Sequence, residues 1–495
     1  MKRSSGILMA MTSLPSPYGI GTMGKSAYKF VDFLKASGQS YWQLLPLGPT
    51  GYGNSPYQSF STFAGNPYLI DLDMLIADKL LKKKEVESCD WGSDPQRVDY
   101  GKIYESRFKV LRLAFSRSEA LTSEIEAFRK ENVRWVETYA LYMSVKGHFS
   151  QAAWTDWPDE DIRMHRPQAV EKYKEELKDE LDFYIFIQYL FFKQWKLLKD
   201  YAHSKGIEFI GDIPIYVAMD SADVWSEPEF FQLDSRNVPT EVSGVPPDPF
   251  NDDGQLWGNP LYDWDKLRED GYGWWLRRID GALALYDIIR IDHFRGLESY
   301  YAVPYGADTA KNGRWIKGPD KDFIRVIKSW FAGIRIIAED LGYVTPEVKS
   351  LLDYSGFPGM KILEFAFGAN HDYDYLPHNS CANSVSYLGT HDNDTLLGWV
   401  KSTPAKEKKF TVKYLNITEE EGWTWGMIRG GMSTTSNLFV LQMQDLLALG
   451  PEARMNTPGI PAGNWQWRML PDALNKDLSR KLLEYTVLFS RAPQK

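Results

Sequence analysis

Carboxylate side chains follow several short apolar runs in this sequence. The carboxylates placed in this way are Asp212, Asp292, Glu339, Asp340, Asp392 and Asp394. Two carboxyl groups in different environments can cleave a glycosidic bond, because one protonates the leaving oxygen while the other attacks carbon or activates water. Any one of these residues could instead cap a helix or pair with an arginine. Taken together, they predict a chemical site at one end of a sheet.

Three basic or imidazole side chains accompany these carboxylates. Arg290 precedes Asp292 by two positions, so both side chains leave the same face of a regular strand. We expect the guanidinium to orient Asp292 and to keep it ionised, as a nucleophile requires. His293 and His391 stand beside Asp292 and Asp392 and could donate hydrogen bonds to substrate hydroxyls.

Metal binding is the alternative use of the same residue types, because Asp, Glu and His also bind Mg²⁺ or Zn²⁺. The sequence has no H-E-x-x-H motif and no pair of histidines four residues apart. Ligands at strand ends stay open, since spacing alone does not test them. A serine nucleophile has no support, because no G-x-S-x-G motif occurs. We therefore expect no metal and no cofactor.

Eight short apolar runs could carry these residues. They span residues 5–15, 41–47, 206–214, 287–292, 334–340, 361–367, 384–392 and 437–445. Their continuous apolar character is typical of parallel strands that are buried on both faces. Residues 25–38 and 322–333 have helical character. The pattern predicts an α/β fold, a (β/α)₈ TIM barrel with catalytic groups at the carboxyl ends of its strands. A doubly wound sheet is the alternative, but no glycine-rich phosphate motif follows any strand.

Two intervals interrupt this alternation. Residues 72–205 are charged and helical in period, which predicts a mainly helical subdomain. Residues 218–275 are dense in Pro, Gly, Asp and Trp, which predicts a long irregular region with a function. We expect residues 1–495 to form a single catalytic barrel unit with these two insertions.

Composition excludes several classes of partner. The 495 residues carry a net charge of −9, which argues against binding nucleic acid or an anionic membrane through bulk charge. No run of 18 apolar residues occurs, so we expect no membrane span. The start, "MKRSSGILMAMTSLP", lacks a small-residue cleavage site, and we interpret it as a first strand and not as a signal peptide.

Cysteine usage bears on the compartment. Only Cys89 and Cys381 occur, which gives no disulfide framework and is typical of a reducing compartment. We expect a cytoplasmic location; a plastid transit peptide that has already been removed is the alternative. Nothing in the sequence indicates an oligomeric state.

Aromatic residues are abundant, with 18 Trp, 28 Tyr and 25 Phe. Many lie in stretches rich in Gly and Pro, where exposed ring faces would suit sugar rings. The alternative is that they fill a large core.

Three strings at predicted strand ends, "RIDHFRG" (290–296), "AEDLG" (338–342) and "LGTHDND" (388–394), resemble the catalytic-strand motifs of the α-amylase superfamily. Longer strings narrow the resemblance to the amylomaltases, which are 4-α-glucanotransferases also called disproportionating enzymes. They are "TSLPSPYGIG" (12–21), "GNSPYQSFSTFAGNPYLIDL" (53–72), "GDIPIYVAMDSADVW" (211–225), "PPDPFNDDGQLWGNPLYDW" (246–264) and "EARMNTPGIPAGNWQWR" (452–468).

This resemblance implies transfer of α-1,4-glucan segments between maltooligosaccharides, amylose or starch by a retaining double displacement. Asp292 matches the nucleophile, Glu339 the acid/base and Asp392 the third carboxylate, which holds sugar hydroxyls of the donor. We expect neighbouring negative charge to raise the pKa of Glu339, and the two reacting carboxyl groups to lie about 5 to 5.5 Å apart.

The residues that we expect to bind substrate are Tyr57, Asp212, Phe250, Trp257, Arg290, His293, His391 and Asn464. The resemblance implies that Tyr57 is an aromatic platform beside the cleaved bond, and that the loop carrying Phe250 and Trp257 arches over the cleft. Asn464 would lie near the acceptor. The pattern alone leaves open whether His293 and Arg295 contact sugar or only brace the strand end.

Two other functions stay open at this point. A hydrolase of the α-amylase type would share the three carboxylates, and a non-catalytic glucan-binding protein would keep the aromatic residues. Residues 9–11, "MAM", and 430–437, "GGMSTTSN", depart from the family pattern, which affects the expected acceptor site and helix packing but not the reaction.

Overall fold

The computed structural model describes residues 2–51, 53–247, 251–367, 373–460 and 462–493. Eight parallel strands form the central sheet, and each lies in one of the eight predicted runs or overlaps it. They are β1 (Ser4–Leu8), β2 (Tyr41–Gln43), β3 (Glu208–Ile213), β6 (Ile288–Ile291), β9 (Ile336–Ala338), β10 (Gly359–Ile362), β11 (Ser384–Tyr387) and β12 (Leu438–Gln442). The strand order is β10-β11-β12-β1-β2-β3-β6-β9, and all pairs are parallel. Followed around the barrel from β1, this is the order in which the eight strands occur along the chain. The predicted (β/α)₈ barrel is confirmed.

The barrel closes between β9 and β10 through few hydrogen bonds. The N–H of Ala338 donates to the carbonyl of Pro358 (2.9 Å). The N–H of Met360 donates to the side chain of Asp340 (2.6 Å), which takes the place of a strand partner. A Cβ at Gly359 would lie only 2.6 Å from Asp340 Oδ2, so glycine is needed where this carboxylate approaches the strand.

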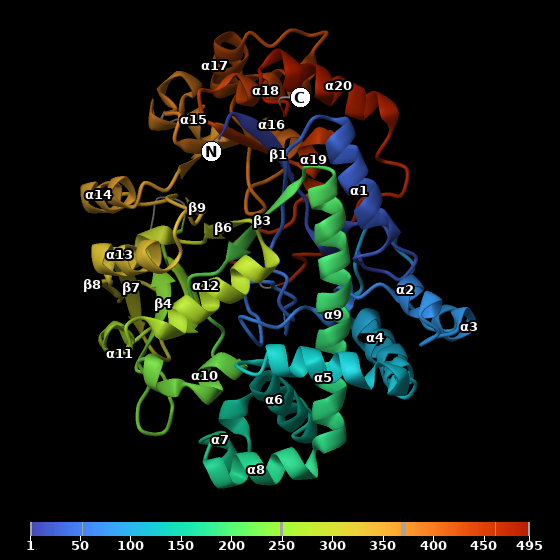
Figure 1. The fold of residues 1–495 in the computed structure, drawn as a ribbon. Coiled ribbons are helices and arrows are strands. Elements are labelled where there is room, and N and C mark those ends of the chain that lie inside the picture. Colours follow the sequence, from blue (N-terminus) through green and yellow to red (C-terminus); the bar gives the residue numbers. More distant parts are fainter. Residues whose placement is uncertain (1, 52, 248–250, 368–372, 461, 494–495) are drawn as a thin grey trace.

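Helices surround the barrel (Figure 1). Those of the strand–helix alternation include the two that the sequence predicted. They are α1 (Lys25–Ala36), α12 (Gly273–Leu285), α13 (Asp320–Trp330), α14 (Pro346–Ser355), α15 (Leu363–Ala366), α16 (Leu396–Ser402), α17 (Ala405–Leu415), α18 (Gly422–Ser433), α19 (Met443–Leu446) and α20 (Lys476–Leu488). Apolar side chains of the strands and of these helices form one continuous core.

The interval 72–205 is helical. It contains α2 (Leu72–Ala77), α3 (Lys83–Glu87), α4 (Tyr100–Phe115), α5 (Thr122–Glu131), α6 (Val136–His148), α7 (Glu160–Arg163), α8 (Pro167–Glu176) and α9 (Lys178–Ser204). The long α9 runs from the group α5–α8 to the barrel, where it leads into β3 (Figure 1). In the described part of the chain, no helix is both long and apolar enough to cross a membrane.

The interval 218–275 is more regular than expected. Besides α10 (Ala222–Ser226) and α11 (Trp264–Glu269), it holds β4 (Glu241–Val245) and β5 (Gln255–Pro260). These strands join β7 (Ser299–Pro304) and β8 (Arg314–Lys317) in an antiparallel sheet of order β5-β4-β7-β8, which we call the small sheet. The prediction of an irregular region was wrong for these strands, because β4 pairs with a strand far along the chain. That the chain is one catalytic unit with two insertions stays a prediction.

Candidate active site

Arg290 is the buried cation of the barrel mouth. It lies opposite Asp212 in the ladder between β3 and β6, and its Nη1 lies 2.5 Å from Asp212 Oδ2 and 3.1 Å from Asp292 Oδ1. Burial lowers the pKa of Arg290, but the charges of Asp212 and Asp292 outweigh burial and raise it well above its usual value. Arg290 bonds both carboxylates and so holds both side chains toward one point; the two-residue spacing predicted the contact with Asp292 but not the one with Asp212.

Glu339 lies beside Asp292 because their strands are paired. Ile291 and Ala338 are partners in the ladder between β6 and β9, and the two acids follow directly. Both oxygens of Glu339 accept main-chain hydrogen bonds, from the N–H of His293 (2.6 Å) and of Leu341 (3.0 Å). His293 adopts a left-handed conformation (φ +49°), which turns the chain immediately after Asp292.

Burial changes the acidity of both carboxyl groups. It raises the pKa of Glu339, with Arg290 and the two main-chain donors opposing; the charge of Asp340 contributes least. Neighbouring charge is therefore not the main cause, contrary to our expectation. Burial also raises the pKa of Asp292 well above its usual value, since Arg290 opposes burial while Asp212, Glu339 and Asp392 add to it. We expected Arg290 to keep Asp292 ionised; its charge does lower the pKa of Asp292, but burial outweighs it. Burial therefore favours the protonated form of both acids.

Asp392 is the most open of the three predicted catalytic carboxylates. Its side chain is 43% exposed, compared with 27% for Asp292. Oδ1 accepts a hydrogen bond from Asn456 Nδ2 (2.6 Å), and the main-chain oxygen accepts one from Arg454 Nη2 (2.7 Å). One carboxylate oxygen, Oδ2, is left facing His391 Nε2 at 3.4 Å.

Tyr57 joins the two halves of the site. Its hydroxyl lies 2.8 Å from Asp212 Oδ2 and 2.8 Å from His391 Nε2, and the Tyr57 and His391 rings stack with centroids 5.3 Å apart. The single hydroxyl proton goes to the carboxylate, so His391 carries its proton on Nε2 and donates to the tyrosine oxygen. Burial lowers the pKa of His391, which keeps the ring neutral.

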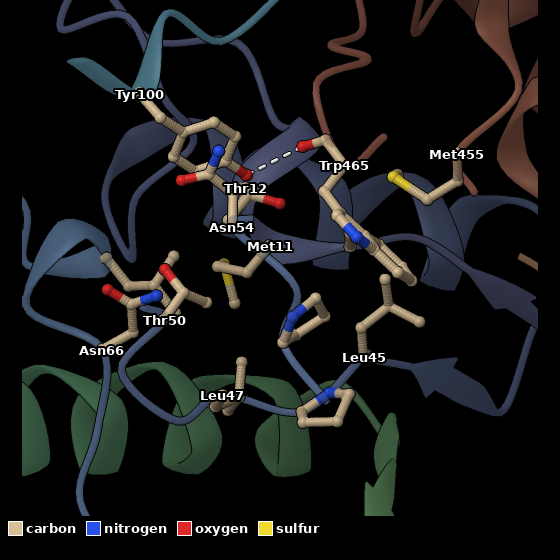
Figure 2. Close-up of a pocket in the computed structure, with 14 residues that line it drawn as sticks. Met11, Thr12, Leu45, Leu47, Thr50, Asn54, Asn66, Tyr100, Met455 and Trp465 are labelled. Carbon is tan, nitrogen blue, oxygen red and sulfur yellow. Dashed lines mark hydrogen bonds between the residues drawn. The ribbon is translucent and has the colours of Figure 1, made fainter. Parts of the chain in front are cut away.

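Trp465 borders the site and a small pocket. Its ring lies 5.7 Å from that of Tyr57 and 6.1 Å from that of His391. Figure 2 shows the Trp465 ring lining a pocket with Met455 and Leu45, and Tyr100 donating a hydrogen bond to the Trp465 carbonyl (2.8 Å). Tyr100 begins α4, so the helical insertion helps to hold this side of the site.

Each edge strand of the small sheet brings a tryptophan to the segment after Asp292. Trp257 of β5 packs edge-on against His293, with ring centroids 4.8 Å apart. Trp315 of β8 lies under the guanidinium of Arg295, with Cζ 3.7 Å from the ring centroid. Burial lowers the pKa of His293 to about 3, and its Nε2 has no hydrogen-bond partner within the described residues.

Arg295 braces loops. It is buried and donates hydrogen bonds to the carbonyl of Tyr343 (2.5 Å) and to Ser299 Oγ (2.9 Å). His293 positions Glu339 through its main chain, while its ring nitrogen stays unpartnered. Of the two residues that the sequence left open, Arg295 is bonded within the protein, whereas His293 Nε2 is buried without a partner among the described residues.

Two predicted substrate-binding residues are not brought into this arrangement. The side chain of Asn464 is bonded within its own loop, accepting from the Thr457 N–H (3.0 Å) and donating to the Ile460 carbonyl (2.7 Å). Phe250 lies outside the described residues. That these two side chains bind substrate stays a prediction.

Sequence reasoning missed Arg454, Asn456 and Trp465, although all three lie in the quoted string 452–468. A second group of acids lies at the ends of β10, β11 and β12, and we call it the second acidic cluster: Glu364, Asp394 and Asp445. Sequence reasoning named Asp394, which is partly buried, but missed the buried Glu364 and Asp445. Asp445 is the last residue of the predicted run 437–445, so the strand-end signal was present there, whereas Glu364 lies inside the predicted run 361–367. Within the described ranges, no group of three or more His, Cys, Asp or Glu side chains is arranged to hold a metal ion.

Comparisons with known proteins agree with this geometry. A family model described as 4-alpha-glucanotransferase matches residues 9–474. The chain is 50% identical to a 4-alpha-glucanotransferase of Clostridium butyricum, over 98% of this chain and 100% of the relative. It is 47% identical to a 4-alpha-glucanotransferase of Thermus thermophilus, over 97% and 98%.

Among solved structures, the amylomaltase of Streptococcus agalactiae in complex with acarbose superposes with a TM-score of 0.97 at 41% identity, covering 99% of this chain and 100% of the other. The chain therefore belongs to the 4-alpha-glucanotransferase family, the amylomaltases, and is an enzyme that transfers α-1,4-glucan segments.

Proposed function

We propose that Asp292, Glu339 and Asp392 carry out this transfer by a retaining double displacement. The observation that carries the proposal is the pairing of Ile291 with Ala338, which sets Asp292 and Glu339 side by side at the barrel mouth. A main-chain N–H next to Asp292 then holds the Glu339 carboxyl group. A nucleophile and an acid that are fixed relative to each other suit an attack on one face of a sugar and protonation of its leaving oxygen.

In the first step, Asp292 attacks the anomeric carbon while the proton of the pair leaves from Glu339 to the glycosidic oxygen. The C–O bond to the leaving glucan breaks, and an ester bond between Asp292 and the glucosyl unit forms. The raised pKa of Glu339 supports this step, because the acid then holds its proton more firmly until transfer. Arg290 favours the microstate in which Asp292 is ionised and the proton resides on Glu339.

Asp392 acts on the same sugar through its hydroxyl groups. Asn456 occupies Oδ1 and leaves Oδ2 for the substrate. A hydrogen bond that becomes stronger as the sugar ring becomes oxocarbenium-like lowers the activation barrier of the reaction. A hydrogen bond that is equally strong in the ground state and in the transition state would not lower it.

In the second step, Glu339 removes the proton from the 4-hydroxyl of an acceptor glucan, and that oxygen displaces Asp292. The α-1,4 linkage is rebuilt and both carboxyl groups return to their initial states. The family acts on α-1,4-glucans; for this chain we propose maltooligosaccharides, amylose and starch as donors and acceptors. The rings of Tyr57, Trp257 and Trp465 would favour a stacked sugar over water at this step.

The test is the product ladder from maltotriose. We expect glucose together with maltodextrins longer than maltotriose, since a glucosyl-enzyme passes its glycan to a second sugar. A hydrolase of the α-amylase type would give glucose and maltose only, and that result would refute transfer as the main reaction. A crystal structure with the Asp292 and Glu339 carboxyl groups about 9 Å apart would refute double displacement, because retention needs about 5 to 5.5 Å.

We also propose a cytoplasmic location. The support is the pair of free cysteines, Cys89 and Cys381, which suits a reducing compartment. Fractionating cells that produce the chain and assaying maltotriose conversion in each fraction tests this; activity confined to the secreted fraction would refute it.

A further inference from the structure

Two exposed aromatic side chains flank Arg295 at the rim of the site. Trp315 of β8 is 37% exposed and Tyr343 is 69% exposed. Their ring centroids lie 3.7 Å and 5.8 Å from the same atom, Arg295 Cζ. The two rings therefore form one aromatic patch on the surface and are not two unrelated side chains.

The Trp315 ring is held in place although part of it is open. One face is covered by the Arg295 guanidinium, and its edge packs against buried Tyr301, with centroids 5.1 Å apart at 65°. Arg295 is itself fixed by Ser299 and by the Tyr343 carbonyl. A ring that is oriented before a ligand arrives loses little conformational entropy on binding.

The patch is continuous with the catalytic segments. Tyr343 follows Glu339 by four residues, and Arg295 follows Asp292 by three. On the other edge of the small sheet, Trp257 contacts His293 in the same segment. The small sheet thus brings one tryptophan to each side of the turn that follows Asp292.

The exposure of Trp315 and Tyr343 alone would not identify this patch as a binding surface. Trp330 is also 69% exposed, but it is the last residue of α13, on the outside of the barrel. What distinguishes Trp315 and Tyr343 is that both contact one buried residue of the catalytic turn. The charge between the rings belongs to Arg295, which is buried and bonded through both terminal nitrogens, so the patch offers ring faces to an uncharged ligand.

We propose that Trp315 and Tyr343 form a second glucan-binding platform, outside the catalytic cleft, that holds a distal part of a long α-1,4-glucan. The inference rests on the proposed function, because the occupant is a longer form of the same substrate. Sugar rings present apolar C–H faces that can stack on exposed aromatic rings. Short glucans that fill only the cleft would not reach this platform.

The experiment compares Tyr343→Ala, Trp315→Ala and the control Trp330→Ala on amylose and on maltotriose. We expect the ratio of kcat/KM on amylose to kcat/KM on maltotriose to fall about three- to tenfold in the first two variants and to stay at the wild-type value in the control. Tyr343→Ala is the decisive variant, because it keeps the main-chain carbonyl that Arg295 holds.

Binding is measured separately by gel electrophoresis in the presence of glycogen, with each substitution placed in the Asp292→Asn chain. Weaker retardation of the Tyr343→Ala chain than of the Trp330→Ala chain supports the platform. Equal retardation of the two, or an equal loss on amylose and maltotriose in Trp315→Ala with none in Tyr343→Ala, overturns it in favour of a bracing role. Glycogen retardation needs no chemistry, so it still decides this inference if the maltotriose products refute transfer.

Discussion

Two groups of acids lie at the same end of the barrel, and they differ in the hydrogen-bond partners that surround them. In the catalytic group, Arg290 bonds Asp212 and Asp292, and main-chain N–H groups bond both oxygens of Glu339. In the second acidic cluster, Glu364 Oε1 and Asp445 Oδ2 are buried without a hydrogen-bond partner within the described part of the chain. Burial raises the pKa of Asp445 to about 7, and burial with the charges of Asp445 and Asp394 raises that of Glu364 well above its usual value.

The difference shows that buried carboxyl groups alone do not make a reactive site. Asp292 and Asp392 are partly exposed and reachable, whereas Glu364 and Asp445 are closed off. Asp445 uses Oδ1 to accept from the N–H of Leu396, which begins α16. We therefore infer that the second acidic cluster holds protons and supports a helix, while the catalytic group, with a cation and an open face, performs the chemistry.

The largest expected effect separates the two groups directly. Asp292→Asn should lower the transfer rate by about 10⁴-fold or more, because the amide cannot form the glucosyl-enzyme. Asp445→Asn, an identical chemical change in the second acidic cluster, should keep the rate within about threefold, since this side chain is buried and closed off from substrate. Initial rates on maltotriose measure both. Comparable losses of transfer rate in the two variants would contradict the division into a catalytic group and a second acidic cluster without a catalytic role.

The next effect concerns Arg290, the cation that bonds two carboxylates of the catalytic group. Arg290→Gln leaves Asp212 buried without its guanidinium, so we expect a loss of about 3–5 kcal/mol in the free energy of unfolding. Adding Asp212→Asn to Arg290→Gln should restore part of that loss, because the unpaired charge is removed. Urea unfolding of the single and double variants tests this; strictly additive losses would mean that the pair is not coupled.

A third effect uses the proton of the second acidic cluster. Folded Asp445 keeps its proton up to about pH 7, whereas an unfolded Asp loses it near pH 4. The folded chain binds more protons in this window, so the stability that Asp445 contributes falls as the pH rises through it.

Asp445→Asn abolishes that dependence, and the variant should gain on the order of 3 kcal/mol over wild type between pH 5 and pH 8. Denaturant unfolding at the two pH values measures the gain, with Asp280→Asn, at an exposed carboxyl group, as the control. A gain in stability that is the same at both pH values would show that Asp445 does not keep its proton to a higher pH in the folded chain than in the unfolded chain.

The smallest effect probes the hydroxyl that joins Asp212 to His391. Tyr57→Phe keeps the ring that stacks on His391 and removes only the two hydrogen bonds, so we expect kcat/KM to fall about tenfold. Tyr201→Phe removes a hydroxyl that bonds Asp32 on the surface and should leave kcat/KM unchanged. A loss near 10⁴-fold in Tyr57→Phe would instead give that hydroxyl a direct part in the chemistry.

The barrel was predictable because each of its strands has a recognisable local sequence pattern. Each is a short apolar run, and the spacing of Arg290 and Asp292 sufficed to place both on one face. The small sheet was not predictable in this way: β4 reads "EVSGV" and β5 reads "QLWGNP", with glycine or proline in each, and β4 pairs with β7 more than fifty residues later. Such strands are stabilised by distant partners and not by their own pattern.

Within the site, the carboxylates at the strand ends could be named from the sequence, but the main-chain donors could not. The N–H groups that hold Glu339 come from His293 and Leu341 only because the chain turns after Asp292 with a left-handed residue. The order of causes for the acidity of Glu339 also depends on burial, which spacing does not reveal. Glu364 was hidden for a different reason: in "KILEFAF" it sits inside an apolar run, and only the structure separates strand β10 from helix α15 there.

The contact between β9 and β10 determines where the barrel opens locally. The amide of Met360 is protected from exchange with solvent by the carboxylate of Asp340 instead of by a neighbouring strand. Burial raises the pKa of Asp340, so this carboxylate takes up a proton in milder acid than an ordinary aspartate and then accepts the Met360 amide more weakly. As the pH falls, hydrogen exchange at Met360 should therefore lose protection earlier than exchange along β1 and β12, whose ladder is built from main-chain bonds. The barrel would open first along a line that begins beside Glu339.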